Sequence, residues 1–148
     1  AVASLFLARQ LNNCLIDLGG DIRVIGSKSN GEPWAMGISD PDSPQKAIAT
    51  VKLNNHALTT SGDYQRYAMI NGKRYCHIIN AKTGWPVGIN NRESNRSVSV
   101  IAPQCIIAGS MTSIAMLMEE NAQPWLNDSS LSWLLINASG EIKNNNLM

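Results

Sequence analysis

The segment from residue 74 to residue 86 contains the side chains whose types and spacing best fit a reaction site. Its first part alternates like a strand and would place Tyr75, His77 and Ile79 on one side, while Thr83-Gly84 favours a turn. An imidazole held on a strand can act as a base near neutral pH, beside backbone groups that can bind a phosphate or a base. A single histidine on a strand is more often structural than catalytic, so His77 alone does not establish a site.

A predicted hairpin brings a second polar segment to the same place. Asn71-Gly72 favours the two positive φ angles of a type I′ turn, so residues 67–70 and 73–75 should pair as antiparallel strands. The hairpin then puts Ser61-Gly62-Asp63 at the same end of a sheet as His77. Hydroxyl and backbone N–H groups of this kind bind phosphate or cap a turn, and both interpretations stay open.

The pair Gly19-Gly20 separates two predicted strands, at residues 14–18 and 22–25. Because glycine has no Cβ, the backbone here can approach a ligand or another strand closely, and Asp21 adds an acceptor. A β-bulge between two halves of one hairpin explains the pair equally well. The pair is not part of a dinucleotide-binding fingerprint, since the third glycine and the following helix are missing.

The three cysteines, Cys14, Cys76 and Cys105, are widely spaced and form no C-x-x-C pair, so neither a zinc knuckle nor a disulfide framework is indicated. We expect them to be small buried hydrophobic residues. Cys76 directly precedes His77, but neighbours on a strand point to opposite faces, so the two side chains are not expected to meet as a nucleophile and its base.

Composition restricts the class of protein. A chain of 148 residues with 44% hydrophobic residues can bury one core and suits a single domain. The formal net charge of +1, without a basic run, argues against nucleic-acid or anionic membrane binding. No apolar run approaches the roughly 20 residues that span a bilayer, and no signal-peptide pattern opens the chain. The sequence starts at Ala1 within a helical pattern, so targeting information could have preceded it.

The remaining patterns predict elements that must position these residues. The predicted strands cover residues 14–18, 22–25, 34–38, 47–53, 97–102 and 131–136. Helices are predicted over residues 2–12, 103–118 and 121–127, the second with Ile107, Met111, Ile114 and Met118 on its buried stripe. His56 is expected in an exposed turn, residues 90–96 in a polar loop, and the Asn-rich tail is expected to fray.

Three ordered motifs carry a family resemblance: Leu18-Gly19-Gly20-Asp21, Thr60-Ser61-Gly62-Asp63-Tyr64, and the segment that starts at His77. The last resembles the pattern H-h-I-D-P-x-T-G-x-P, where h is apolar. Together they make the chain resemble the FAD:protein FMN transferases, the ApbE-type proteins also called thiamine biosynthesis lipoproteins. The resemblance covers almost the whole chain but only the C-terminal half of the family's domain. It implies an α+β fold, a mainly antiparallel sheet with helices packed on it as in the C-terminal part of the T-fold-like ApbE domain, with residues 1–148 a single partial domain.

The resemblance also implies a reaction. FMN is moved from the substrate FAD to a Thr hydroxyl of an acceptor flavoprotein, with release of AMP and help from Mg²⁺; some relatives hydrolyse FAD instead. His77 would orient or deprotonate the attacking hydroxyl, and the backbone at Ile79 would contact the flavin nucleotide. The other cofactor-binding candidates are Gly19, Gly20, Asp21, Ser61, Gly62, Asp63, Thr83 and Gly84. A periplasmic location with a lipid anchor is expected through the resemblance alone.

Two positions depart from the family pattern. The family helix carries A-D-x-x-x-T, whose Asp and Thr present oxygens to Mg²⁺ one helical turn apart. Here Gly109 replaces the carboxylate and Ser113 keeps only a hydroxyl, so we expect weak or absent metal binding. Asn80 replaces an Asp and cannot raise the basicity of His77 as a carboxylate would.

Two classes of function follow from these residues. The chain is either part of a flavin transferase or a degenerate relative that acts as a flavin-nucleotide-binding or structural module, and by itself it is expected to be inactive. A face that packs against the family's N-terminal half should be exposed here, available for that half or for self-association. We also expect the loop after His77 and the start of the helix at 103–118 to meet around a single nucleotide pocket.

Overall fold

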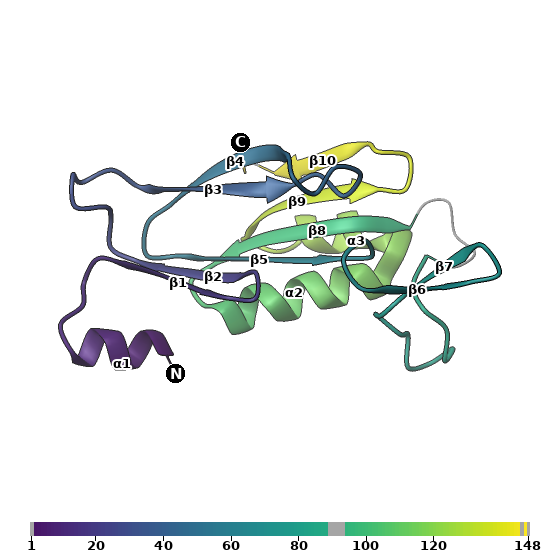
Figure 1. Ribbon diagram of the computed structural model, residues 1–148, viewed down its shortest axis with the longest axis horizontal. Coiled ribbons are helices and arrows are strands. Elements are labelled where there is room, and N and C mark those ends of the chain that lie inside the picture. The colour runs from purple at the N-terminus through teal and green to yellow at the C-terminus, as the bar shows by residue number, and fades with distance from the viewer. Residues whose placement is uncertain (1, 89–93, 146, 148) are drawn as a thin grey trace.

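The computed structural model describes residues 2–88, 94–145 and 147, and its centre is a six-stranded antiparallel sheet (Figure 1). The strand order is β1-β2-β5-β8-β9-β10. These strands are β1 Cys14–Leu18, β2 Asp21–Ile25, β5 Ala57–Gly62, β8 Asn95–Ala102, β9 Ser132–Asn137 and β10 Ile142–Asn145. The predicted class, an antiparallel sheet with helices packed on it, is confirmed.

Both faces of this sheet are covered. Helices α2 (Cys105–Met118) and α3 (Ala122–Asn127), joined by the 3-10 turn η1 (Glu119–Asn121), pack on one face. The two-stranded sheet of β3 (Trp34–Ser39) and β4 (Ala47–Leu53) packs on the other. Strand β9 serves both cores: Trp133 and Leu135 face the helices, while Leu134 and Ile136 face β3 and β4. The continuous apolar run of β9 is therefore the mark of a strand buried on both sides.

Tight turns that contain glycine or asparagine connect the strands of two β-hairpins. Gly19 and Gly20 have φ of 69° and 98° and form the two-residue turn between β1 and β2, in which Leu18 pairs with Asp21. The β-bulge alternative is therefore wrong. Asn71 and Gly72, with φ of 51° and 74°, form the predicted turn between β6 (Tyr67–Ile70) and β7 (Lys73–Cys76). This β6–β7 hairpin extends away from the six-stranded sheet (Figure 1).

Helix α2 presents only part of the predicted stripe to the sheet. Its buried residues are Ala108, Thr112, Ala115 and Met116, and the predicted Met111 and Met118 are half-buried and pack against this core. The prediction is wrong at Ile107 and Ile114, which are exposed, because small residues allow the helix to lie close to β5 and β8.

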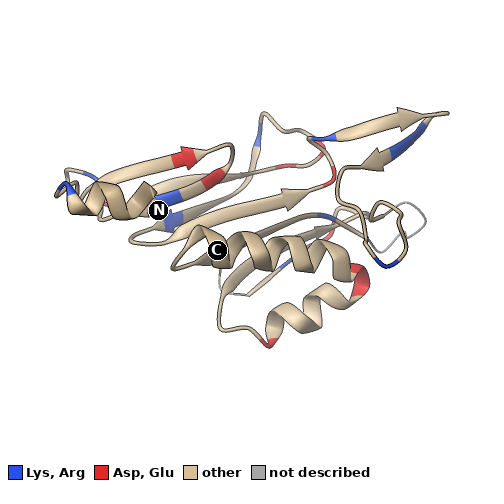
Figure 2. Ribbon diagram, turned by 90° about the horizontal axis from the view of Figure 1, so that it is seen from below, with Lys and Arg blue, Asp and Glu red and all other residues tan. Residues whose placement is uncertain are grey.

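The outward face of α2 is uncharged and mostly apolar, with Ser110 and Ser113 exposed among its aliphatic residues. The helix contains no charged residue and is tan throughout in Figure 2, and Ile106 is 74% exposed. Helix α1 (Val2–Ala8) is shorter than predicted and buries no residue. An exposed apolar face was expected, and its occupant stays a prediction.

The C-terminal tail does not fray as predicted. It forms β10, which pairs with β9, and Leu147 beyond it is buried. The side chain of Asn145 accepts a hydrogen bond from the Trp133 N–H at 2.8 Å and donates one to the Leu131 carbonyl at 2.9 Å. Strand β8 starts at Asn95, within the predicted polar loop, of which residues 90–93 lie outside the described part. Within the described residues, no helix has the length and apolar character needed to cross a membrane.

Candidate functional site

A hollow of about 440 Å³ lies where the β1–β2 turn, the end of β5 and the base of the β6–β7 hairpin meet. We call it the central hollow. The predicted site residues that line it are Gly19, Gly20, Asp21, Ser61, Gly62 and His77. Three motifs separated in the sequence are thus brought together. The hairpin argument predicted that Ser61-Gly62 and His77 lie together, but not that the Gly19-Gly20 turn joins them.

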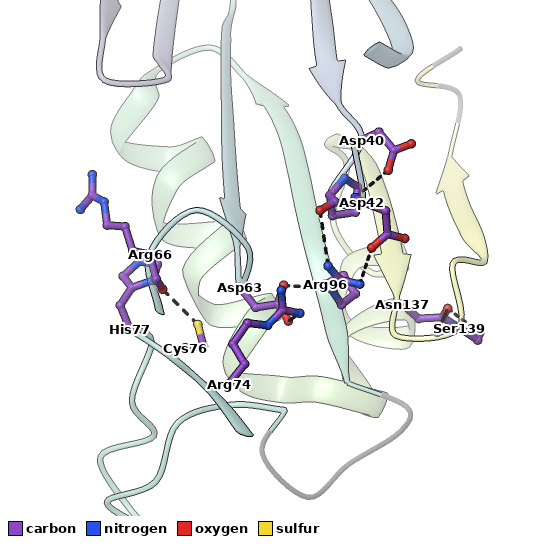
Figure 3. A network of polar contacts seen from close by, with 11 residues as sticks. Asp40, Asp42, Asp63, Arg66, Arg74, Cys76, His77, Arg96, Asn137 and Ser139 are labelled. Atoms are coloured by element: carbon purple, nitrogen blue, oxygen red, sulfur yellow. Dashed lines mark hydrogen bonds and ion pairs between the residues drawn. The ribbon is translucent and has the colours of Figure 1, made fainter. Parts of the chain in front are cut away.

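His77 is held at the central hollow by the main chain of Arg66. Strand β7 ends at Cys76, and the His77 N–H donates to the Arg66 carbonyl at 3.2 Å. The ring atom Nδ1 lies 3.1 Å from the same carbonyl oxygen (Figure 3). Because a carbonyl only accepts, this contact assigns the proton of the neutral ring to Nδ1 and leaves the lone pair on Nε2. The residue is exposed, and in this tautomer Nε2 can accept a proton, as a general base must.

Cys76 lies closer to His77 than predicted. Its Sγ is 3.8 Å from Nδ1, because the strand alternation stops where β7 ends. The contact does not activate the thiol: burial raises the pKa of Cys76, and the Nδ1 proton already has the Arg66 carbonyl as its acceptor. Cys76 is buried as expected, whereas Cys14 and Cys105 are half-buried; all three are free.

Ser61 connects the central hollow to helix α2. Its hydroxyl donates to Thr112 Oγ1 at 2.9 Å, and Thr112 Oγ1 donates to the Gly109 carbonyl at 3.0 Å. The Ser61 hydroxyl is therefore a structural donor in this arrangement. The glycine after it is also constrained, because a Cβ on Gly62 would lie 2.4 Å from the ring of Tyr64, another residue that lines the central hollow.

The carboxylate of Asp63 has structural partners instead of a place in the central hollow. It accepts from Arg96 Nε at 3.0 Å and from Arg74 at 3.2 Å, and Arg96 also binds Asp42 at 2.9 Å (Figure 3). Burial lowers the pKa of Arg96, but hydrogen bonds and charge from Asp63 and Asp42 outweigh it, and the pKa is raised. Asp63 thus connects the β6–β7 hairpin to β8.

The loop after His77 is folded on itself. Gly84 N–H and Thr83 N–H donate to the Asn80 carbonyl at 2.8 and 3.2 Å, and Ile79 forms an isolated bridge with Pro86. Ile79, Thr83 and Gly84 are not among the residues that line the central hollow. Neither this turn nor the start of α2 lines the central hollow, so the prediction that the loop after His77 and the start of this helix meet around one pocket is wrong.

A second, shallower hollow of about 520 Å³ lies along α2, and we call it the α2 hollow. Gly109 and Ser113, the two predicted metal positions, line it together with Asp21, which also lines the central hollow. Gly109 offers no side-chain oxygen and Ser113 only a neutral hydroxyl. Within the described residues, no three or more His, Cys, Asp or Glu side chains group as a metal site. These residues do not fit a bound Mg²⁺ ion.

Sequence reasoning missed Gly37, Ser39 and Arg66, which also line the central hollow. Gly37 and Ser39 belong to β3, far from the motifs in sequence and without a local signal. Arg66 lies three residues after Asp63, and its place beside His77 follows only from the pairing of the hairpin's two ends.

The statistical model of the ApbE family matches residues 1–135. The chain belongs to the ApbE family. Among curated proteins, it is 36% identical over 132 residues to the FAD:protein FMN transferase of Haemophilus influenzae, covering 86% of this chain and 37% of that protein. The FAD:protein FMN transferase of Vibrio cholerae is 35% identical over 120 residues, covering 80% of this chain and 35% of its own length.

Solved structures of ApbE proteins share the fold. The ApbE protein of Thermotoga maritima superposes with a TM-score of 0.86 at 28% identity, over 97% of this chain and 46% of its own. The flavin transferase ApbE of Vibrio cholerae gives a TM-score of 0.77 at 30% identity, over 97% of this chain and 45% of its own. The chain thus spans a little over a third of the two curated relatives and under half of these solved ApbE chains.

Proposed function

We propose that this protein is an FAD:protein FMN transferase, which moves FMN from FAD to a threonine hydroxyl of an acceptor flavoprotein and releases AMP. The proposal rests on the position of His77 at a hollow that residues of three separate motifs line, in a chain that belongs to the ApbE family. The names of the relatives support a transferase rather than a non-catalytic module.

In the proposed reaction, His77 Nε2 takes the proton of the acceptor threonine as its oxygen attacks the phosphorus of the FMN half of FAD. The new O–P bond replaces the bond to the bridging oxygen, which leaves with AMP, so the two phosphates are divided between product and leaving group. The Arg66 carbonyl keeps the ring in the required tautomer and favours the imidazolium that forms, because it accepts from Nδ1.

The contact between the Arg66 carbonyl and His77 compensates for the carboxylate that the family has at the position of Asn80. The Asn80 side chain accepts from the Lys82 N–H at 2.9 Å and so shapes the loop. Its task of orienting the imidazole falls to the Arg66 carbonyl, which is part of the main chain. Substitution at Asn80 therefore need not abolish base catalysis.

The test compares the two histidines of the chain. His77→Ala and His56→Ala should be made in the protein at its full encoded length and assayed for covalent FMN on a threonine-containing acceptor, read as flavin fluorescence on a denaturing gel. Because His77→Ala removes the proposed general base, the rate of FMN transfer should fall by roughly 10²–10⁴-fold while the affinity for FAD is retained. His56 is an exposed turn residue that binds its own loop through the Asn54 carbonyl at 2.7 Å, so its variant should transfer normally. Undiminished transfer by His77→Ala, or no transfer by the unsubstituted protein, would refute the proposal.

A further inference from the structure

Arg66 places a cation at the central hollow. It precedes β6 at the base of the β6–β7 hairpin, lines the central hollow and is exposed. Its main-chain carbonyl holds His77, while Figure 3 shows its guanidinium pointing away from Asp63 and Arg96. The backbone of this one residue thus fixes the proposed base, and its side chain is left for another task.

Among the residues that the structure describes, none forms an ion pair with Arg66. The two other arginines of this region, Arg74 and Arg96, are both paired with Asp63. Among the described residues that line the central hollow, Arg66 is the only lysine or arginine, and Asp21 is the only carboxylate. Within the described part of the chain, an anion that enters the central hollow would therefore meet Arg66 as an unpaired cation, in the same hollow as His77.

A phosphate group suits this cation well. Arginine presents its N–H groups as a planar fork that binds two phosphate oxygens at once, and the guanidinium stays charged at every physiological pH. Phosphoryl transfer also needs positive charge to offset the diphosphate, and the residues at Gly109 and Ser113 do not fit the metal ion that could supply it.

We propose that Arg66 binds the diphosphate of the nucleotide in the central hollow. Its guanidinium supplies the positive charge that a metal ion would otherwise supply, since the residues at the Gly109 position do not fit one. This inference rests on the proposed function for the identity of the nucleotide. Because the Arg66 carbonyl also positions His77, one residue brings the base and the attacked phosphorus into the same place.

The test measures ligand binding in EDTA, with the protein at its full encoded length. Arg66→Gln is compared with Arg66→Lys, which keeps the charge, and with Lys82→Gln, which removes an exposed cation from the loop after His77 without touching the central hollow. The probes are FAD, ADP and riboflavin, followed by flavin fluorescence or calorimetry. The main-chain contact with His77 is unchanged in all three variants.

We expect Arg66→Gln to weaken FAD and ADP binding about tenfold, since a charge-assisted hydrogen bond is worth on the order of one such factor, and to change riboflavin binding less than about twofold. Arg66→Lys should recover part of the loss, and Lys82→Gln should bind all three ligands normally. Equal losses for riboflavin and ADP, equal losses in Arg66→Gln and Lys82→Gln, or no loss at all would overturn the inference.

The outcome is separable from that of the proposed function. Normal FMN transfer together with unchanged ADP affinity in Arg66→Gln would overturn the Arg66 inference alone. Arg66-dependent ADP binding without any FMN transfer would refute the transferase and leave the diphosphate site standing. Failure of the unsubstituted protein to bind ADP or FAD would overturn both.

Discussion

Asp63→Asn tests whether this carboxylate is a structural clamp or a ligand of the nucleotide. The side chains of Asp63 and Arg96 are 14% and 15% exposed and lie 3.0 Å apart, so the pair is largely shielded from water. The substitution keeps the shape and an acceptor oxygen but removes the charge. Arg96 keeps its other partner, Asp42, whose side chain is 68% exposed.

The expected loss follows from these two contacts. Replacing a charged by a neutral acceptor at the shielded Arg96 contact costs about 1.5 kcal/mol, and losing the more exposed Arg74 pair about 0.5 kcal/mol. The free energy of unfolding should therefore fall by about 2 kcal/mol, which lowers the Tm by about 6 °C for a protein of this size. Asp42→Asn removes the exposed partner of the same arginine and should cost about 0.5 kcal/mol or less.

Urea unfolding at matched ionic strength measures both variants, with ADP affinity below the transition as the second readout. A structural clamp predicts a large difference in unfolding free energy between Asp63→Asn and Asp42→Asn, and unchanged ADP affinity for both folded proteins. If the two variants unfold alike while Asp63→Asn loses ADP affinity, the carboxylate belongs to the binding site and our assignment is refuted.

Three further substitutions test other parts of the structure. Gly109→Asp has open space around its new Cβ and should create measurable Mg²⁺ affinity by calorimetry, and unchanged affinity would show that the α2 hollow is no metal position. Gly62→Ala would bring a Cβ to 2.4 Å from Tyr64 and should lower the free energy of unfolding by about 1–3 kcal/mol; a neutral effect in urea would mean that the ring is free to move. Asn145→Ala should cost about 1–2 kcal/mol in the same assay, because it leaves the Trp133 N–H and the Leu131 carbonyl without their partner, and a negligible loss would contradict the pairing of the tail.

Local patterns with strong turn signals were predictable from the sequence. The strands at residues 14–18 and 47–53 match the structure, because glycine, proline or asparagine marks an end of each. The convergence of Ser61-Gly62 with His77 was also predictable, since the Asn71-Gly72 turn alone determines how the two flanking segments pair.

Features that depend on distant partners were not predictable in this way. The pairing of β10 uses the asparagines that composition alone assigns to a frayed end, because Asn145 bonds to β9 across the sheet. The Asp63–Arg96 contact joins residues 33 positions apart, so Asp63 resembled a ligand while its partner was unknown. The buried face of helix α2 was not predictable for a third reason. Hydrophobicity alone predicts that Ile107 is buried in preference to Ala108, whereas close packing of the helix on the sheet favours burial of the smaller residue.

The insertion point of the β6–β7 hairpin has a consequence for how such proteins diverge. The chain leaves the sheet at Gly62 and returns beside it, where Ser97 is the direct antiparallel neighbour of Gly62. Arg66, the β6–β7 hairpin and His77 lie in the part of the chain between these two paired positions. Changes in the length or sequence of this hairpin can therefore alter the lining of the central hollow while the pairing of β5 with β8 is kept.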